Sequence, residues 1–338
     1  MKFFLLSYLL LLHLVSLGQL KPDLYPEDLN TEEIRVNCYC KPGVENKSPS
    51  RGLALIYNRL GAGTYQDDQN TSFSDPRSAY TQRQNFEFKI KAPLILKDNF
   101  KLLLGYKRQV EYFDFNQFGE EFNFAFQELD EETLKSNTIS LLVSRPLNET
   151  RYMIFRLSYG ADGDYGNWMS FRQKYAIYKF FGLYAFKPNA DFEWGIGVGA
   201  TKNFRRFGAL PFILYNRNFN KKWGIEAVLP GFVFGRYNIN RNNLLLFGVE
   251  YESESFRIDS DTDNPTAFAY AYNHSAIRNS IRVEHRIVPW VWGAIRLGYQ
   301  FNFNSEFDSR SDETTLFFAD PTNAMFLTIG IFVSPEGV

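Results

Sequence analysis

Long apolar runs, histidine and cysteine are all scarce in this chain of 338 residues. Beyond the N-terminal stretch, no apolar segment reaches the ~20 residues that a membrane-spanning helix needs. The formal net charge is −1, so the chain has no basic field of the kind that attracts nucleic acid. These absences exclude a helical membrane protein and argue against nucleic acid as a partner. A membrane location would therefore require a closed barrel.

The only two cysteines, Cys38 and Cys40, are separated by one residue. On a strand both side chains would point the same way, and a disulfide between them would close a small, strained ring. A metal site needs more ligands, and the only histidines beyond the N-terminal stretch, His274 and His285, are far away in the sequence. We interpret both cysteines as structural, with a strained redox pair as the alternative, and we expect no metal and no cofactor.

The N-terminus has the pattern of a secretory signal peptide. One lysine precedes an apolar run, and the small residues Ser16 and Gly18 stand at the −3 and −1 positions of a plausible cleavage site. We predict residues 1–18 as the signal peptide and residues 19–50 as a polar periplasmic lead-in with one short strand. Residues 51–338 would then form one outer-membrane domain.

Aromatic residues, in contrast, are abundant: they make up 17% of the chain, with 34 Phe and 20 Tyr. The mean hydropathy is nevertheless −0.30, as expected where strands alternate apolar with polar residues. Aromatic residues also gather near the ends of expected strands, which is typical of girdles at the two membrane interfaces. The members of these groups are Tyr112, Phe113, Phe115, Trp168, Trp194, Trp223, Trp290, Trp292, Phe317 and Phe318.

Residues 244–303 alternate with the two-residue period of β-strands, in which successive Cβ atoms point to opposite faces of a sheet. One face is apolar and aromatic: Leu245, Phe247, Val249 and Tyr251, then Ile277, Ile281, Val283 and Ile287, then Ile295, Leu297, Tyr299 and Phe301. The opposite face carries glutamates and arginines. A soluble sandwich would bury the apolar face against a second sheet. A membrane barrel would turn that face to lipid and keep the charges in the lumen.

Strand length favours the barrel. Most expected strands have about ten residues or more, which is what a tilted strand needs to cross a bilayer, whereas strands of soluble proteins centre on roughly 5–6. From residue 83 to about 190, short connections also alternate with long polar ones, as in outer-membrane barrels, and beyond that the alternation fails. The expected strands lie near 51–60, 83–95, 100–113, 134–145, 151–160, 173–186, 191–200, 207–216, 222–237, 244–258, 275–288, 290–303 and 323–334.

This set of strands is odd in number, whereas bacterial single-chain barrels of this kind have an even number. Either 222–237 is two strands broken at Pro230-Gly231, or one strand is misplaced. We therefore predict an all-β fold, a transmembrane antiparallel β-barrel of about 12–14 strands. Pro93, Pro211 and Pro230 inside strand patterns predict bulges or bends, because proline removes a ladder donor.

One long connection, residues 116–133, fits two templates. Phe118, Phe122, Phe126 and Leu129 repeat at helical spacing and predict a short amphipathic helix, over the barrel mouth or at the membrane interface. Phe122, Phe124 and Phe126 also alternate, as in an aromatic extension of a strand. The sequence leaves both interpretations open.

Prolines and polar turns between residues 210 and 251 carry a family resemblance. The matching positions are Pro211, Lys222, Trp223, Leu229, Pro230 and Tyr237, with Arg51-Gly52 and Leu134-Lys135 upstream. The pattern resembles an uncharacterised family of bacterial outer-membrane β-barrels, known only as a domain of unknown function, over most of 51–334. The resemblance implies an outer-membrane barrel and brings no catalytic residues. The chain lacks the terminal phenylalanine common in such barrels.

The charged face of the last long strands supplies the candidate site. We predict a lumen constriction that selects small solutes, as rings of charge do in pores; its candidates are Glu250, Glu252, Glu254, Arg278, Arg282, Glu284, Arg286 and Arg296. Further lumen candidates are Glu87, Lys89, Lys91, Lys101, Lys107, Glu111, Arg156 and Glu193. The alternative is a barrel filled by paired side chains, since a water channel is secure only at roughly 16 strands or more.

A second feature of the expected lumen is a row of glycines, Gly195, Gly197 and Gly199, on one face of their strand. The row either leaves room in the lumen or lets another segment pack closely. We favour the packing interpretation.

Three functional hypotheses follow. The first is passive passage or binding of a small solute, with outer-membrane lipid and the barrel-assembly machinery as partners. The second is a structural or assembly role in the envelope, with a lumen closed by ion pairs or by residues 19–50. The third is a membrane-embedded lipid hydrolase. A histidine and a serine two residues apart would lie on the same face of a strand, but neither His274 nor His285 has a serine two residues further on. We therefore disfavour this hypothesis and expect no enzyme.

Overall fold

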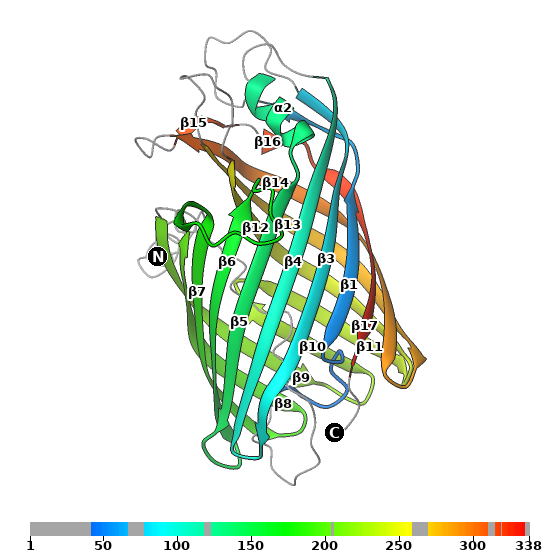
Figure 1. Cartoon of the computed structure of the whole chain (residues 1–338). Coiled ribbons are helices and arrows are strands. Elements are labelled where there is room, and N and C mark those ends of the chain that lie inside the picture. The colour runs from blue at the N-terminus through cyan, green and yellow to red at the C-terminus, as the bar shows by residue number, and fades with distance from the viewer. Residues whose placement is uncertain are drawn as a thin grey trace, which may run out of the picture.

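The chain forms a closed antiparallel barrel of 14 strands. The computed structural model describes residues 42–66, 78–117, 123–203, 206–258, 270–309, 315–318 and 320–334. The signal peptide, both cysteines and the strand expected in the lead-in lie outside these residues. Each barrel strand pairs with the next, and β1 closes the barrel against β17 (Figure 1). The barrel strands are β1 (Leu53–Leu60), β3 (Ser78–Lys97), β4 (Phe100–Gln117), β5 (Leu134–Pro146), β6 (Arg151–Gly163), β7 (Ala176–Asn189), β8 (Phe192–Asn203), β9 (Arg206–Asn218), β10 (Trp223–Leu229), β11 (Phe232–Asn240), β12 (Asn243–Ile258), β13 (Tyr270–Val288), β14 (Val291–Ser309) and β17 (Ala324–Val333).

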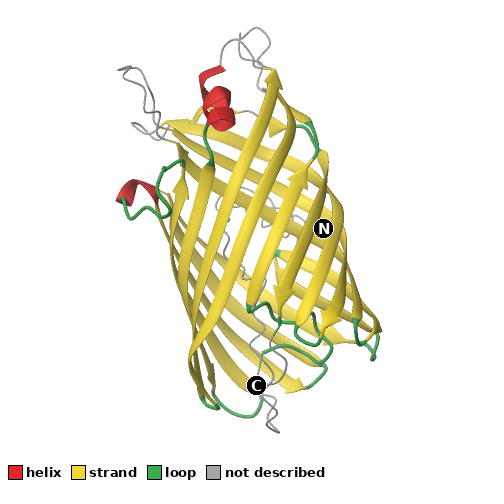
Figure 2. Ribbon diagram, turned by 45° about the vertical axis from the view of Figure 1, so that its right-hand side comes forward, coloured by secondary structure: helices red, strands yellow, loops and turns green. Residues whose placement is uncertain are grey.

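The remaining elements lie at the end of the barrel that carries the long connections, which we call the long-loop end (Figure 2). They are the strands β2 (Gly63–Gln66), β15 (Thr315–Phe318) and β16 (Asp320–Pro321), the helix α2 (Asn123–Glu131) and the 3₁₀ turn η2 (Gln173–Tyr175). The opposite, short-turn end carries the tight connections. Helix α2 resolves the connection at 116–133 in favour of the helical interpretation. Within the described residues, no helix is long and apolar enough to cross a membrane.

The two predicted faces of the last long strands are confirmed. Ile281, Ile295 and Leu297 are more than half exposed on the outer surface, whereas Glu250 and Arg296 are buried inside. The outer surface is therefore apolar and the inner one charged, as in a barrel that contacts lipid. The residues predicted for the aromatic girdles divide into two groups. Tyr112, Trp168, Trp194, Trp223 and Trp290 are exposed, but Phe113, Phe115 and Trp292 lie on the inward register and are buried.

The break predicted at Pro230-Gly231 is the turn between two short strands, β10 and β11, which makes the strand count even. Pro93 lies at a register shift between β3 and β4, as predicted. Pro211 does not: its pairing with β8 is regular. The prediction of a bulge at Pro211 is wrong because β10 reaches only to Ile213, so Pro211 has no neighbouring strand on that side. A proline, which has no N–H to donate, is tolerated at such an edge position without a bulge.

The short β10–β11 hairpin leaves a notch in the wall. Residues 206–212 of β9 and 252–256 of β12 extend beyond the hairpin and have no strand paired to them on that side within the described residues. Nearer the long-loop end, β12 contacts strands on the other side of the notch. Arg257 pairs in parallel with Gly163 of β6, and the Asn203 Nδ2 of β8 donates to Ser255 Oγ at 3.3 Å. The notch is thus bordered by β9, the hairpin tip and β12.

Two apolar clusters fill much of the interior. The upper cluster, towards the long-loop end, joins α2 to the tops of β2–β5 and β12–β14: Tyr65, Tyr80, Phe113, Phe115, Phe126, Leu129, Leu134, Phe256, Ile258, Tyr270, Tyr272 and Phe307. The lower cluster joins β5–β10: Leu142, Tyr152, Ile154, Phe181, Leu183, Ala185, Phe212, Leu214 and Val228. Between them the lumen is polar.

The glycine row belongs to the lower cluster's packing. The rings of Phe181 and Phe212 stack with centroids 4.4 Å apart, and a Cβ on Gly197 would overlap the Phe212 ring and the backbone of Gly182. Gly197 therefore lets an aromatic side chain lie directly on the strand, which is the packing interpretation.

Candidate functional site

The polar middle of the barrel holds a cavity of about 270 Å³. Among the described residues, ten basic side chains and six acidic ones line it, an excess of four positive charges. The basic ones are Arg51, Arg83, Lys89, Lys91, Lys107, Arg156, Lys179, Arg278, Arg282 and Arg296, and the acidic ones are Glu87, Glu111, Asp162, Glu250, Glu252 and Glu254. Strand alternation brings these residues inside, because every second side chain of a barrel strand faces the lumen.

Six of the eight predicted constriction residues line the cavity. Glu284 and Arg286 do not; they lie nearer the short-turn end of β13. Glu284 is fully buried and contacts Arg51 at 3.1 Å and Arg282 at 3.3 Å. The Arg286 guanidinium lies 5.2 Å from the ring centroid of Trp292. The predicted set therefore divides into a group at the cavity and a group beneath it.

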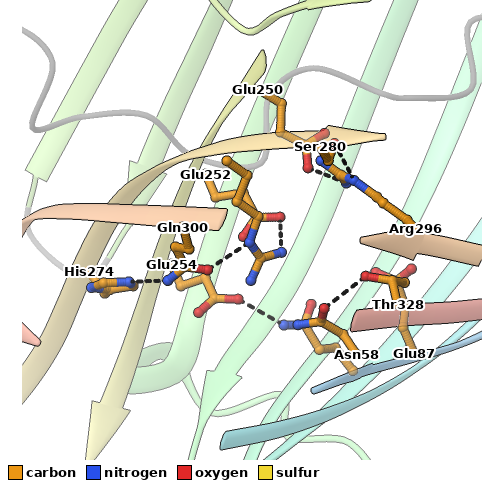
Figure 3. A network of polar contacts seen from close by, with 12 residues as sticks. Asn58, Glu87, Glu250, Glu252, Glu254, His274, Ser280, Arg296, Gln300 and Thr328 are labelled. Carbon is orange, nitrogen blue, oxygen red and sulfur yellow. Dashed lines mark hydrogen bonds and ion pairs between the residues drawn. The ribbon is translucent and has the colours of Figure 1, made fainter. Parts of the chain in front are cut away.

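On one side of the cavity, the glutamates of β12 are paired with arginines (Figure 3). Glu250 forms an ion pair with Arg296, and Glu252 with Arg278. Arg296 also donates from Nε to Ser280 Oγ at 2.8 Å. We call this surface of β12, β13 and β14 the paired wall. The registers bring these charged side chains onto one small area of the wall. Glu250 lies directly opposite Arg278 of β13, and Arg296 lies directly opposite Arg282 of the same strand.

The third glutamate of the paired wall reaches across the lumen. Glu254 forms an ion pair with Arg83 of β3 and accepts a hydrogen bond of 3.1 Å from Gln109 of β4. Arg83 also pairs with Glu111. This bridge ties opposite sides of the barrel together just beneath the upper aromatic cluster, where the Arg83 guanidinium lies 5.0 Å from the Phe113 ring centroid.

Sequence reasoning missed four charged residues of the cavity: Arg51, Arg83, Asp162 and Lys179. Arg83 stood at the edge of an expected strand, and Arg51 carried only the family resemblance. Lys179 had no visible signal, because β7 has apolar side chains on both faces: Tyr178 is exposed outside while Phe181 is buried inside. Where both faces are apolar, alternation does not reveal which is the lumen.

Residues 43–48 lie inside the short-turn end of the barrel. The Gly43 backbone N–H donates to Glu193 Oε1 at 2.7 Å, and the Asn218 Nδ2 donates to the Glu45 carbonyl at 2.8 Å. Ser48 donates from its backbone N–H to Glu226 Oε1 at 3.3 Å and from its hydroxyl to Glu284 Oε2 at 2.8 Å. We call this segment the plug, because buried carboxylates of three different strands hold it in the lumen.

The cavity extends to the notch. Its lining includes Gly231 at the hairpin tip, Asn203 of β8, and Ser253 and Ser255 of β12. The two serines belong to the outer register of β12, so the cavity reaches past the inner face here. Ser255 Oγ donates to Asn273 Oδ1 at 2.6 Å. Hydroxyl and amide groups therefore border the notch on the β12 side, in place of the apolar residues found lower on the same face.

His274 is buried and contacts a serine that its sequence neighbours did not indicate. Its Nδ1 lies 2.8 Å from Ser305 Oγ, and its Nε2 lies 3.4 Å from Gln300 Nε2. Its cross-strand neighbour Glu254 is engaged by Arg83, so no carboxylate of the described residues orients this imidazole. The pair lacks the acid that a hydrolytic triad requires. His285 is exposed and contacts Asn243 at 2.8 Å.

No group of three or more His, Cys, Asp or Glu side chains in the described ranges is placed to hold a metal ion. The cavity is therefore a site of charged, hydroxyl and amide groups. Such a lining can hold and orient a small polar solute through hydrogen bonds and ion pairs.

One family model and several solved structures match the chain. A family model described as a domain of unknown function, DUF6268, matches residues 55–334. No curated protein matches. Among solved structures, the chain is similar to the COG4313 outer-membrane channel from Pseudomonas putida F1, with a TM-score of 0.42, 10% identity, and coverage of 87% of this chain and 99% of that one.

Two further structures are similar at a comparable level of identity. A Pseudomonas aeruginosa FadL homologue has a TM-score of 0.40 and 10% identity, and the match covers 83% of this chain and 90% of that one. The outer-membrane protease OmpT from Escherichia coli has a TM-score of 0.26 and 10% identity, and the match covers 86% of this chain and 100% of that one. These likenesses concern the barrel architecture.

Proposed function

Because the chain belongs to the DUF6268 family, whose description assigns no activity, we propose a function from the geometry of its lumen. The protein is an outer-membrane barrel that admits a small polar solute into a central binding cavity and passes it to the periplasm when the plug moves. The observation that carries this proposal is the charged cavity of about 270 Å³. It lies in the middle of the barrel, where a purely structural wall would be filled by packed side chains.

The route from outside depends on which part of the long-loop end is covered and which part is open. The upper aromatic cluster and α2 cover the part of the long-loop end above β2–β4 and β12–β14. The notch beside β12 is bordered by Ser253 and Ser255, and the cavity reaches both. A polar border suits a solute that arrives from water. The notch is therefore the proposed entrance, and it lies above Tyr251, where the apolar face of β12 ends.

The route to the periplasm requires a movement of the plug. Residues 43–48 occupy the short-turn end and are held by Glu193, Glu226 and Glu284. Backbone and hydroxyl groups of the plug donate to these carboxylates, and the Glu45 backbone exchanges hydrogen bonds with Ala190 and Asn218. A hydrogen bond to a charged acceptor is worth about 1.5–3 kcal/mol. Such contacts can be released without unfolding the barrel. The plug is thus a gate in the proposed passage.

A second candidate function rests on the same plug. If residues 43–48 and the ion pairs of the paired wall stay in place, the lumen is closed and the barrel serves as a structural or assembly element of the envelope. The two candidates differ in one measurable property, the conductance of the folded protein.

Single-channel conductance in a planar bilayer tests the proposal, with wild type compared with Ser48→Pro. Proline at position 48 removes both the backbone N–H that contacts Glu226 and the hydroxyl that contacts Glu284. We expect rare openings in wild type and frequent ones in the variant. The matched control is Ser50→Ala, two residues further on. Silence of both wild type and Ser48→Pro, in protein shown to be folded by heat-modifiable gel mobility, would leave the closed-lumen function.

A further inference from the structure

The wall of the cavity opposite the notch-bordering part of β12 carries a continuous polar row. Consecutive strands from β3 to β8 place one residue each directly opposite the next: Lys91, Gly105, Ser140, Ser158, Lys179 and Thr201. All six line the cavity. Directly opposed residues on neighbouring strands lie about 4.5–5.5 Å apart. The row is therefore a band of ammonium and hydroxyl groups running part of the way around the lumen.

Three successive members of this row have no partner among the described residues. The Thr201 hydroxyl is buried, with the residue only 2% exposed, and it makes no hydrogen bond. The side chains of Ser158 and Lys179, the next two residues along the row, make no hydrogen bond or ion pair within the described part of the chain. A buried hydroxyl without a partner costs about 1–3 kcal/mol. One buried hydroxyl of this kind beside a half-buried hydroxyl and a half-buried ammonium group, all facing one cavity, indicates a surface built to contact a bound molecule.

The charge of the row defines the chemistry of that molecule. Lys91 and Lys179 are cationic, and no member of the row is acidic. Arg156 adds a third cation two residues from Ser158 along β6, with its Nη2 3.5 Å from Ser140 Oγ. The carboxylates on the opposite side, Glu250 and Glu252, are already paired with arginines. An ammonium group between two hydroxyl donors is complementary to an oxyanion, which accepts several charge-assisted hydrogen bonds at once.

Gly105 keeps the row open at its centre. A Cβ at this position would come within 2.5 Å of the Ser140 hydroxyl. Any larger residue would displace Ser140 and fill the space between Lys91 and Ser140. The glycine therefore leaves the row accessible from the lumen.

We propose that the row formed by Ser140, Ser158, Lys179 and Thr201, with Lys91 at its end, binds an oxyanion group, carboxylate or phosphate, of a small solute. Lys179 supplies the charge, and the hydroxyls of Ser158 and Thr201 donate on either side of it. This inference deepens the proposed function, on which it rests, by naming the class of solute that the cavity holds.

Calorimetric titration of the full-length protein in detergent tests the site without requiring passage. The probes are sodium phosphate and sodium succinate, each at constant ionic strength against sodium chloride. We expect saturable binding of at least one probe. Lys179→Met should weaken binding by about tenfold, because a charge-assisted hydrogen bond is lost. Thr201→Val should weaken it by about threefold or more, without lowering the thermal stability of the unliganded protein, since its hydroxyl has no partner to lose.

Lys202→Met is the matched control, because Lys202 is the next residue of β8 and lies exposed on the outer face. Its binding should equal wild type. Phosphate binding alone or succinate binding alone identifies which oxyanion the site takes. The inference is overturned if neither probe binds, or if Lys179→Met and Thr201→Val bind as wild type does.

Binding and conductance separate this inference from the proposed function. Binding by a protein that never conducts supports the site and removes the passage. Conductance by a protein that binds neither probe supports the passage and removes the site.

Discussion

The two walls of the cavity differ in how far their polar side chains are engaged by other side chains. On the paired wall, Glu250 and Glu252 meet Arg296 and Arg278, and the Arg278 and Arg296 guanidiniums lie 4.8 and 5.1 Å from the Phe326 ring centroid. On the opposite wall, the Thr201 hydroxyl is buried and the side chains of Ser158, Lys179 and Thr201 make no hydrogen bond or ion pair within the described residues. Beneath that row the same strands form the lower apolar cluster.

This difference separates groups that hold the barrel from groups that are available to a solute. A buried ion pair is costly to break, because the remaining charge has no water to solvate it. A polar group without a partner costs stability while the site is empty and recovers that cost when a ligand contacts it. Residues of the paired wall should therefore affect stability most, and those of the row should affect binding most.

The largest effect on stability is expected from breaking the central ion pair. Arg296→Ala leaves Glu250, which is 6% exposed, without its cation. We expect a loss of about 3–5 kcal/mol in the free energy of unfolding, measured by urea titration of the protein in lipid vesicles. Lys179→Met should change the same quantity by no more than ~0.5 kcal/mol. Equal losses in the two variants would show that the walls do not differ in this way.

A neutral replacement sharpens the same comparison. The double variant Glu250→Gln/Arg296→Met removes both charges together and keeps similar side-chain volume. Since no charge is left uncompensated, it should recover most of the stability that Arg296→Ala loses. A double variant no more stable than Arg296→Ala would assign the loss to packing against Phe234 and Phe326 instead.

An intermediate effect is expected where the lower apolar cluster packs on glycine. Gly197→Ala places a methyl group against the Phe212 ring and the Gly182 backbone. Overpacking of this kind typically costs about 1–3 kcal/mol, which the same urea titration measures. Gly166→Ala is the control, because a Cβ there would meet nothing within 4 Å. A loss in the control equal to that in Gly197→Ala would contradict the packing argument.

The smallest effect on stability, with a change in ion selectivity, is expected for charges at the cavity surface. Glu252 has a side chain that is 31% exposed, and its partner Arg278 keeps a hydrogen bond of 2.7 Å to Gln300 Oε1, so Glu252→Ala should cost the least stability of these variants. In a conducting barrel, Glu252→Ala should shift the reversal potential in the direction of anion selectivity, because the substitution removes a negative charge from the lumen. Arg282→Ala should shift it towards cations. Shifts in the same direction for both variants would place the ion path away from these side chains.

The sequence predicted most of the fold from two simple patterns. Alternation marked the strands and their faces, because a side chain that contacts lipid must be apolar whatever its neighbours are. The break at Pro230-Gly231 accounted for the odd number of strands. Pro211 was misread, since a proline is tolerated without a bulge when a neighbouring strand ends early, and the length of β10 was not visible in the sequence of β9.

The site was predicted less completely. The glutamates of β12 and the arginines of β13 stood out because their outward neighbours are uniformly apolar. Lys179, Thr201 and Arg83 did not, since each lies on a strand with apolar residues on both faces or at an uncertain strand end. The contact of His274 with Ser305 joins strands β13 and β14, and no local spacing could indicate it.

By itself, the sequence determined that this protein is a barrel with an apolar outside and a charged inside, because the period of two and the composition of each face are local properties. Only the tertiary structure decided which charges meet, that residues 43–48 enter the lumen, and that a short hairpin opens a notch beside β12. These features depend on register, closure and strand length around the whole barrel, which couple residues far apart in the chain. The row from Lys91 to Thr201 exists only because five separate registers align.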